Sequence, residues 1–173
     1  MNQAGSTLGA QAQTLGAAAV NRANVQYVDV YVLRGREEAL EILALRRAQG
    51  RSPGSWETIH GTIEEGETAV EAALRELREE AGFSADRLYN VSRVEAFYRH
   101  AVGEVAFIPV FAAFVDAARV PRLSPEHDLA VWLAPAEAAA RFSWPRERRA
   151  LEDIVALFGR GDGGLLEDVL RVC

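Results

Sequence analysis

Glu76, Glu79 and Glu80 are the residues whose type and spacing most clearly favour chemistry in this chain. In an α-helix, positions i, i+3 and i+4 are neighbours on the surface, so these carboxylates would share one face. Like charges at i, i+4 cost about 0.2–0.5 kcal/mol per pair on an exposed helix, and the helix macrodipole disfavours negative charge in the last turns. A divalent cation would offset this repulsion, because hard cations prefer carboxylate oxygens as ligands. The spacing therefore predicts a metal-binding cluster.

A solvated helix face is the alternative interpretation of the same residues. Arginines on the helix would then partly neutralise the acids, since Glu71 and Arg75 stand in the favourable i, i+4 order. The loop before the helix favours the metal cluster instead, because it is also acidic and ends at Glu67. A charged surface helix by itself does not predict acidic residues in the tight loop that Gly61 and Gly66 bracket.

The helix that must carry this cluster has clear start and stop signals. Thr68 and Glu71 have the spacing of a capping box, and Gly82 supplies a C-terminal stop. Apolar residues recur at helical spacing between these ends, at Val70, Ala73, Leu74, Leu77 and Ala81. We expect these apolar residues to form the buried face, which leaves the glutamates and arginines on the other sides of the helix.

The segment from residue 61 to residue 83, GTIEEGETAVEAALRELREEAGF, resembles the sequence box of the Nudix hydrolase family at every position. The matching residues are Gly61, Glu67, Arg75, Glu76, Glu79, Glu80 and Gly82, with Leu77 and Phe83 at the apolar positions. A match of this length is far more specific than a lone glycine motif.

The resemblance implies a fold, a reaction class and a role for each matched residue. The family has an α/β/α sandwich around a mixed β-sheet, and its members hydrolyse a nucleoside diphosphate linked to another group. The implied roles are metal ligation by Glu76, Glu79 and Glu80, support of the metal shell by Glu67, orientation of a glutamate by Arg75, and structural roles for Gly61 and Gly82.

Magnesium is the metal expected from this resemblance and from the all-oxygen ligand set, and manganese would substitute for it. The metal would neutralise a pyrophosphate, hold it in line and activate a water for attack on phosphorus. Glu79, another box glutamate or Glu126 would take the proton, and the choice among them varies within the family.

The elements that must position the cluster are visible as alternating or short apolar runs. The strand candidates are residues 27–32, 42–45, 88–98, 104–115 and 129–133. The helix candidates after the box are residues 135–141 and 145–158. Pro109 falls inside one strand candidate, so we expect an edge or a bulge there, because proline cannot donate a ladder hydrogen bond.

Five residues outside the box are weaker candidates for substrate binding or catalysis. Arg46 and Arg47 end a strand at a place where similar sequences bind phosphate through an arginine; a surface ion pair is the alternative. Trp56 could stack on a base or belong to the core. Tyr98 could contact substrate at the rim of a hairpin. Glu126 lies in a loop that resembles the family's variable loop carrying a general base, and a solvated loop glutamate is the alternative.

A looser resemblance across residues 25–158 points to the branch of the family with dATP and dihydroneopterin triphosphate pyrophosphohydrolases. It rests on the order of Leu45-Arg46-Arg47, Ser55-Trp56-Glu57, Glu126-His127, Val131-Trp132-Leu133 and Ser143-Trp144. The implied reaction is hydrolysis of a nucleoside or pterin triphosphate to a monophosphate and pyrophosphate. Cleavage of dinucleoside polyphosphates or RNA 5′ ends is the enzymatic alternative. A non-catalytic nucleotide sensor is the alternative of another class.

One position departs from the family pattern. Many relatives have Pro-Gly before the first glycine of the box, whereas this chain has Ile59-His60. The departure leaves the shape of this loop open, but it does not affect the predicted metal cluster.

Composition favours one compact enzyme domain at residues 24–173 after a flexible tail at residues 1–23. The 173 residues are 49% hydrophobic, which is enough for a sizeable core and short for two domains. The net charge of -6 argues against a general nucleic-acid binder, and no segment has the length of a membrane span. Cys173 is the one cysteine, so we expect no disulfide and a cytoplasmic protein. The expected partner is a small nucleotide, and a homodimer would be unsurprising for this family.

Overall fold

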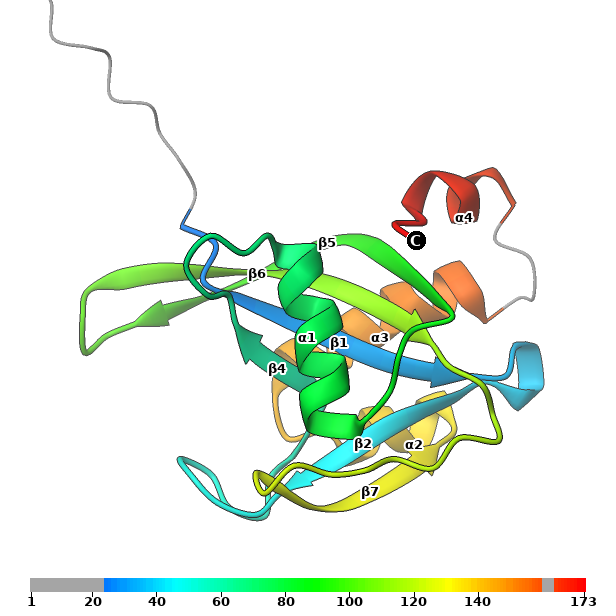
Figure 1. Ribbon diagram of the computed structural model, residues 1–173, viewed down its shortest axis with the longest axis horizontal. Coiled ribbons are helices and arrows are strands. Elements are labelled where there is room, and N and C mark those ends of the chain that lie inside the picture. Colours follow the sequence, from blue (N-terminus) through cyan, green and yellow to red (C-terminus); the bar gives the residue numbers. More distant parts are fainter. Residues whose placement is uncertain (1–23, 160–163) are drawn as a thin grey trace, which may run out of the picture.

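A mixed β-sheet of seven strands organises the fold in the computed structural model, which describes residues 24–159 and 164–173 (Figure 1). The strands are β1 (Tyr27–Arg34), β2 (Glu41–Arg47), β3 (Trp56–Glu57), β4 (Ile59–Thr62), β5 (Arg87–Arg99), β6 (Glu104–Phe114) and β7 (His127–Leu133). The five longer strands coincide with the predicted ones, whereas the predicted bounds do not cover β3 and β4. The flexible tail predicted for residues 1–23 lies outside the described residues.

Strand β1 lies at the centre of the sheet. It runs parallel to β6 and antiparallel to β2 and β4, within the order β3-β2-β1-β6-β5, and β7 pairs with β2. Pro109 of β6 lies opposite Val94 of β5, at a register shift between Asn90 and Val94, so the predicted bulge is confirmed. Pairing of β6 with β1 begins only after the proline, at Val110.

Helices cover both faces of this sheet. Helix α1 (Ala69–Ala81) packs on one face, and α2 (Pro135–Arg141) and α3 (Pro145–Phe158) pack on the other (Figure 1). The buried residues form one apolar cluster on each face, so the predicted α/β/α sandwich is confirmed. A short 3₁₀ turn, η1 (Glu37–Ala39), joins β1 to β2, and α4 (Leu165–Leu170), which is not predicted, contacts β5 and α3. No helix within the described ranges combines the length and apolar character needed to cross a membrane.

The local sequence explains both ends of α1. The hydroxyl of Thr68 accepts a hydrogen bond from the backbone N–H of Glu71 at 3.2 Å, and the Glu71 carboxylate accepts one from the Thr68 N–H at 2.8 Å. This is the predicted capping box. Gly82 ends the helix with φ 70°, a left-handed conformation that a residue without a Cβ adopts at little cost.

The buried face of α1 is wider than its apolar pattern predicts. Glu76 and Glu80 are only 9% and 5% exposed, so the expectation that the glutamates lie away from the sheet is wrong for these two residues. They continue the row of Ala72 at i, i+4 spacing, and this row faces the sheet beside the apolar residues of the helix. Glu79 keeps a side chain that is 58% exposed.

Candidate functional site

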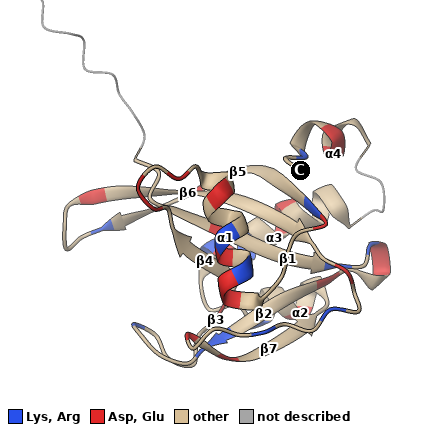
Figure 2. Ribbon diagram, viewed as in Figure 1, with Lys and Arg blue, Asp and Glu red and all other residues tan. Residues whose placement is uncertain are grey.

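Acidic and basic residues alternate along α1, which crosses the sheet in front of β1 and β4 (Figure 2). Of these, Glu76 lies directly against the backbone of β4. A Cβ placed on Gly61 would be 2.0 Å from the carboxyl carbon of Glu76 and 2.1 Å from its Oε1. Position 61 therefore has to be glycine for the carboxyl group to approach the strand this closely. Burial raises the pKa of Glu76, and hydrogen bonding to Arg75 opposes this shift.

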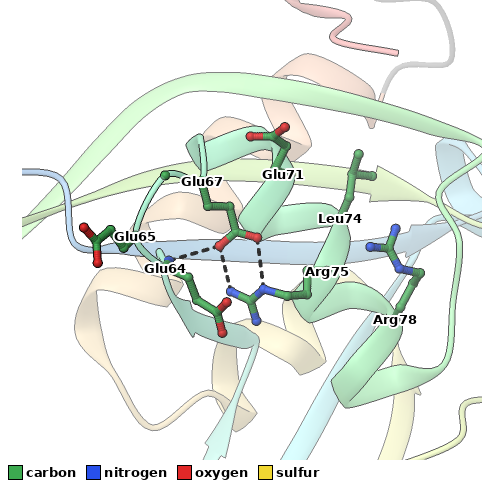
Figure 3. Close-up of a pocket in the computed structure, with 8 residues that line it drawn as sticks. Glu64, Glu65, Glu67, Glu71, Leu74, Arg75 and Arg78 are labelled. Atoms are coloured by element: carbon green, nitrogen blue, oxygen red, sulfur yellow. Dashed lines mark hydrogen bonds and ion pairs between the residues drawn. The ribbon is translucent and has the colours of Figure 1, made fainter.

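Arg75 holds three glutamates together at this site. Its Nε and Nη2 donate to the two oxygens of Glu67, each at 3.0 Å, and its Nη1 donates to Glu76 at 2.8 Å and to Glu79 at 3.1 Å. Figure 3 shows the guanidinium facing the Glu67 carboxylate, which also accepts a hydrogen bond from the N–H of Glu64. The hydrogen bond to Glu67, followed by those to Glu76 and Glu79, raises the pKa of Arg75 above its ordinary value.

An open pocket of about 500 Å³ lies beside this ion-pair group, between the acidic loop and the outer side of α1 (Figure 3). Its lining residues are Glu64, Glu65, Gly66, Glu67, Glu71, Leu74, Arg75 and Arg78. We call Glu67, Glu76, Glu79 and Glu80, together with Arg75, the glutamate cluster. The pocket shares Glu67 and Arg75 with this cluster, but neither Glu76 nor Glu80 lines it.

Glu80 has the most unusual surroundings of the box glutamates. Burial, followed by the nearby charges of Glu76 and Glu126, raises the pKa of Glu80 to about 9. Its Oε2 has no hydrogen-bond partner, and neither has Nδ1 of His127, which lies 3.7 Å away. A buried polar atom without a partner costs free energy, so this arrangement indicates a functional site rather than a packing solution.

A second group of charged side chains extends towards Glu80 from the ends of β2, β3 and β7. Arg47 donates to Glu57 at 2.5 Å and to Glu126 at 3.3 Å, and Nε2 of His127 lies 3.2 Å from Glu57 Oε1. Burial alone would raise the pKa of Glu57, but the hydrogen bonds with His127 and Arg47 lower it below its ordinary value. Glu57 and His127 are not among the predicted site residues. Neither residue lies within a strand candidate, and the burial that requires each of them to have a partner is visible only in the structure.

The two adjacent arginines of β2 have different surroundings. Successive side chains of a strand point to opposite faces, so Arg46 points away from the face that Arg47 reaches. Arg46 instead forms two hydrogen bonds with Asp128, at 2.8 Å and 3.0 Å, as the ion-pair alternative predicts. The structure thus brings Arg47, but not Arg46, to the glutamate cluster.

Trp56 and Tyr98 also lie away from this cluster. Trp56 packs against the core on the face that α2 and α3 cover, and the guanidinium of Arg141 lies 4.8 Å from its ring centroid. Tyr98 is 63% exposed near the end of β5, and no contact within the described residues links its ring to the glutamates. The packing of Trp56 agrees with the core alternative, and a role in substrate binding stays a prediction.

The side chains of the glutamate cluster suit a divalent cation, although they do not yet surround one point. In the described ranges, no group of three histidine, cysteine or carboxylate side chains is placed to hold a metal ion. One nitrogen of Arg75 donates to both Glu76 and Glu79 and so holds these two carboxylates near each other. The unpartnered Oε2 of Glu80 and the exposed carboxylate of Glu79 supply the kind of oxygen atoms that a hard cation requires.

A family model described as the NUDIX domain matches residues 24–154. The chain belongs to the Nudix hydrolase family. The matched region includes every strand of the sheet, the box helix α1 and the second charged group around Arg47.

Two relatives and one solved structure illustrate how this Nudix chain resembles known proteins. The octanoyltransferase of Myxococcus xanthus is 31% identical over 136 residues, which cover 75% of this chain and 36% of that protein. The dihydroneopterin triphosphate diphosphatase of Escherichia coli (strain K12) is 30% identical over 140 residues, which cover 74% of this chain and 91% of that protein. The solved structure of the E. coli dihydroneopterin triphosphate pyrophosphohydrolase aligns with a TM-score of 0.63 at 26% identity, covering 78% of this chain and 99% of that one.

The alignments with several curated relatives cover only part of those proteins. This chain spans between 18% and 38% of the length of four curated relatives that it matches. Family membership therefore rests on the Nudix region itself, which both the family model and the E. coli relative cover.

Proposed function

We propose that this Nudix chain is a magnesium-dependent pyrophosphohydrolase that converts a nucleoside or pterin triphosphate to a monophosphate and pyrophosphate. The observation that carries the proposal is the buried pair of Glu76 and Glu80, with an unpartnered carboxylate oxygen and a pKa of Glu80 raised to about 9. A divalent cation suits such a pair because it supplies the opposing charge. Similarity to the E. coli dihydroneopterin triphosphate diphosphatase over 91% of its length supports the substrate class.

In this proposal, Glu76, Glu79 and Glu80 hold the cation, and Glu67 holds Arg75 in place beside them. When bound, the cation supplies charge neutralisation for the phosphates and Lewis acidity. Arg75 fixes the orientation of Glu76 and Glu79 through its hydrogen bonds.

Two carboxylates of the site are exposed enough to take a proton from the attacking water. The side chains of Glu79 and Glu126 are 58% and 53% exposed. Arg47 donates a hydrogen bond to Glu126, whose charge is near Glu76 and Glu80. A general base within reach of the water lowers the barrier to attack on phosphorus.

The remaining parts of the proposal concern the protein as a whole. We propose that residues 24–173 act as one domain, that the protein works in the cytoplasm, and that Mn²⁺ substitutes for Mg²⁺. The net charge of -6 favours a small nucleotide over a nucleic acid as the substrate.

Quantification of every hydrolysis product from a substrate panel, including pyrophosphate, phosphate and nucleotides, tests this function. The panel contains dATP, other nucleoside triphosphates, dihydroneopterin triphosphate, diadenosine polyphosphates, ADP-ribose and a 5′-triphosphorylated RNA, each with Mg²⁺ and with EDTA. We expect turnover only when Mg²⁺ is present. A nucleoside or pterin triphosphate should yield a monophosphate and pyrophosphate. Tight binding of a nucleotide without turnover of any compound would instead identify a sensor.

Stability should depend on pH and metal together, because of Glu80. Its pKa in the folded protein is raised from 4.5 to about 9, so the folded state keeps a proton that the unfolded chain releases. The stability that this proton provides is complete below pH 4.5 and is lost as the pH rises towards 9. In EDTA, the thermal unfolding midpoint should fall across this range, and Mg²⁺ should reduce the fall by binding the ionised carboxylate.

Differential scanning fluorimetry from pH 5 to pH 9 measures this effect, at about one-unit intervals. Glu147 on the opposite face contributes to the same fall, because burial raises its pKa to about 8, but it lies away from the metal cluster. The difference between the Mg²⁺ and EDTA curves therefore isolates the glutamate cluster. Curves that coincide at every pH would contradict metal binding at Glu80.

Gly61→Ala should reduce activity with the panel substrate by about 10- to 100-fold, because a misplaced catalytic group is costly even when it moves by about 1 Å. The added methyl group would lie 2.0 Å from the carboxyl carbon of Glu76, so the carboxyl group must move. Overpacking should also lower the free energy of unfolding by about 1–3 kcal/mol. Thr62→Ala on the exposed end of β4 is the matched control, and unchanged kinetics in Gly61→Ala would contradict the role given to Glu76.

A further inference from the structure

A second buried polar cluster lies on the opposite face of the sheet, where α3 begins. Asp29 of β1 is 0% exposed, and its Oδ1 lies 2.7 Å from Nδ1 of His60 in β4 and 3.1 Å from Nη2 of Arg146 in α3. Oδ2 of Asp29 and Nε of Arg146 have no partner. In the described ranges, four buried side-chain atoms lack a partner; two belong to this cluster, and the other two belong to Glu80 and His127 at the proposed metal site.

Only the thickness of one strand separates this cluster from the box glutamates. Side chains alternate along β4, so Ile59 packs in the core under α1, His60 faces Arg146, and Gly61 contacts Glu76. In the described sheet, β4 pairs with β1 alone, so its other edge carries no strand. A ligand that lies across this free edge can reach the glutamates with one end and His60 with the other.

His60 offers a flat ring and one ring nitrogen for hydrogen bonding at this edge. Its Nδ1 is already engaged, at 2.7 Å from Oδ1 of Asp29 and 3.3 Å from Nη2 of Arg146. Nε2 is the ring nitrogen left for another partner, on a side chain that is 25% exposed. The ring stacks on Tyr27 with 5.2 Å between centroids and 22° between planes, and the partly exposed ring of Phe97 lies 5.8 Å from Tyr27.

We propose that Tyr27 and His60, with Asp29 and Arg146 behind them, form the subsite for the heterocyclic ring of the substrate. His60 Nε2 forms a hydrogen bond with a polar group of the heterocycle, which lies against the aromatic side chains. Asp29 and Arg146 are positioning residues that hold the imidazole. This inference rests on the proposed function, which places the phosphates at the glutamates on the other side of β4.

A purely structural ion pair accounts less well for the same contacts. A buried ion pair stabilises a fold only when its remaining polar atoms are also satisfied, and both Asp29 and Arg146 keep an unpartnered atom.

Binding of monophosphates, which are reaction products and are not turned over, tests the subsite separately from hydrolysis. Isothermal titration calorimetry with Mg²⁺ would compare dAMP and dihydroneopterin monophosphate with 2′-deoxyribose 5′-phosphate, which lacks a heterocycle. We expect the wild type to bind one of the two heterocyclic ligands at least about tenfold more tightly than the sugar phosphate. His60→Ala should remove about tenfold of this preference and leave sugar phosphate binding within about twofold.

His60→Gln and His100→Ala complete the design. Glutamine keeps a hydrogen-bonding partner for Asp29 but has no ring, so His60→Gln should keep the wild-type unfolding midpoint and lose part of the preference. His100→Ala changes an exposed histidine at the β5–β6 turn and should change nothing. Equal weakening of all ligands, an unchanged preference in the His60 variants, or no preference in the wild type would overturn the subsite. Loss of metal-dependent turnover with the preference intact would overturn the proposed function alone.

Discussion

Glu80→Gln should abolish most of the activity while leaving the fold at least as stable as before. We expect kcat/KM to fall by about 1000-fold, because the site loses a carboxylate that the cation requires. In EDTA the unfolding midpoint should stay level or rise, since the amide cannot carry the charge whose burial raises the pKa of Glu80 to about 9. Loss of activity without loss of stability distinguishes a carboxyl group kept for function from one kept for packing.

Steady-state kinetics on the preferred panel substrate and thermal unfolding in EDTA measure the two effects of Glu80→Gln. Glu38→Gln is the matched control, because Glu38 is an exposed glutamate in η1, outside the box and its pocket. This control should change both quantities little, since surface substitutions usually stay within about 0.5 kcal/mol. An active Glu80→Gln enzyme, or a strongly destabilised one, would contradict the role given to Glu80.

Arg75→Gln should lower both activity and stability, in contrast to the change at Glu80. Arg75 binds three glutamates and also donates to the carbonyl of Thr62 at 2.8 Å, while its side chain is only 18% exposed. We expect kcat/KM to fall by about 100-fold, because Glu76 and Glu79 lose the group that orients them. The free energy of unfolding should fall by about 1–3 kcal/mol, since partly buried acceptors lose their donor.

The metal dependence of stability separates this role of Arg75 from a simple loss of contacts. Without the guanidinium, the carboxylates of the site repel one another, so Mg²⁺ should restore more stability to Arg75→Gln than it adds to the wild type. Arg78→Gln on the exposed side of the same helix is the control, and it should behave like the wild type. Equal Mg²⁺ responses in Arg75→Gln and the wild type would show that Arg75 does not balance the glutamate charges.

The accuracy of the sequence-based predictions follows the range of the interactions involved. The capping box of Thr68 and Glu71 and the stop at Gly82 involve residues within a few positions of one another, and all three are confirmed. The strand candidates are confirmed because an alternating or apolar run is a local pattern. A local pattern does not predict the direction in which a charged side chain points, as Arg46 and Arg47 show. Both arginines end the same strand, and only the pairing of β2 within the sheet places Arg47 beside Glu57.

The sequence by itself determined the helix, its caps, the spacing of Glu76, Glu79 and Glu80, and the family, because these depend on residues that are close along the chain. Only the tertiary structure decided that Glu76 and Glu80 are buried, since burial depends on which row of α1 the sheet covers. The same holds for the cluster around Asp29, whose contacts with His60 and Arg146 join residues 31 and 117 positions apart. Such contacts follow from strand register and from the face on which each helix packs, and neither is a property of a local segment.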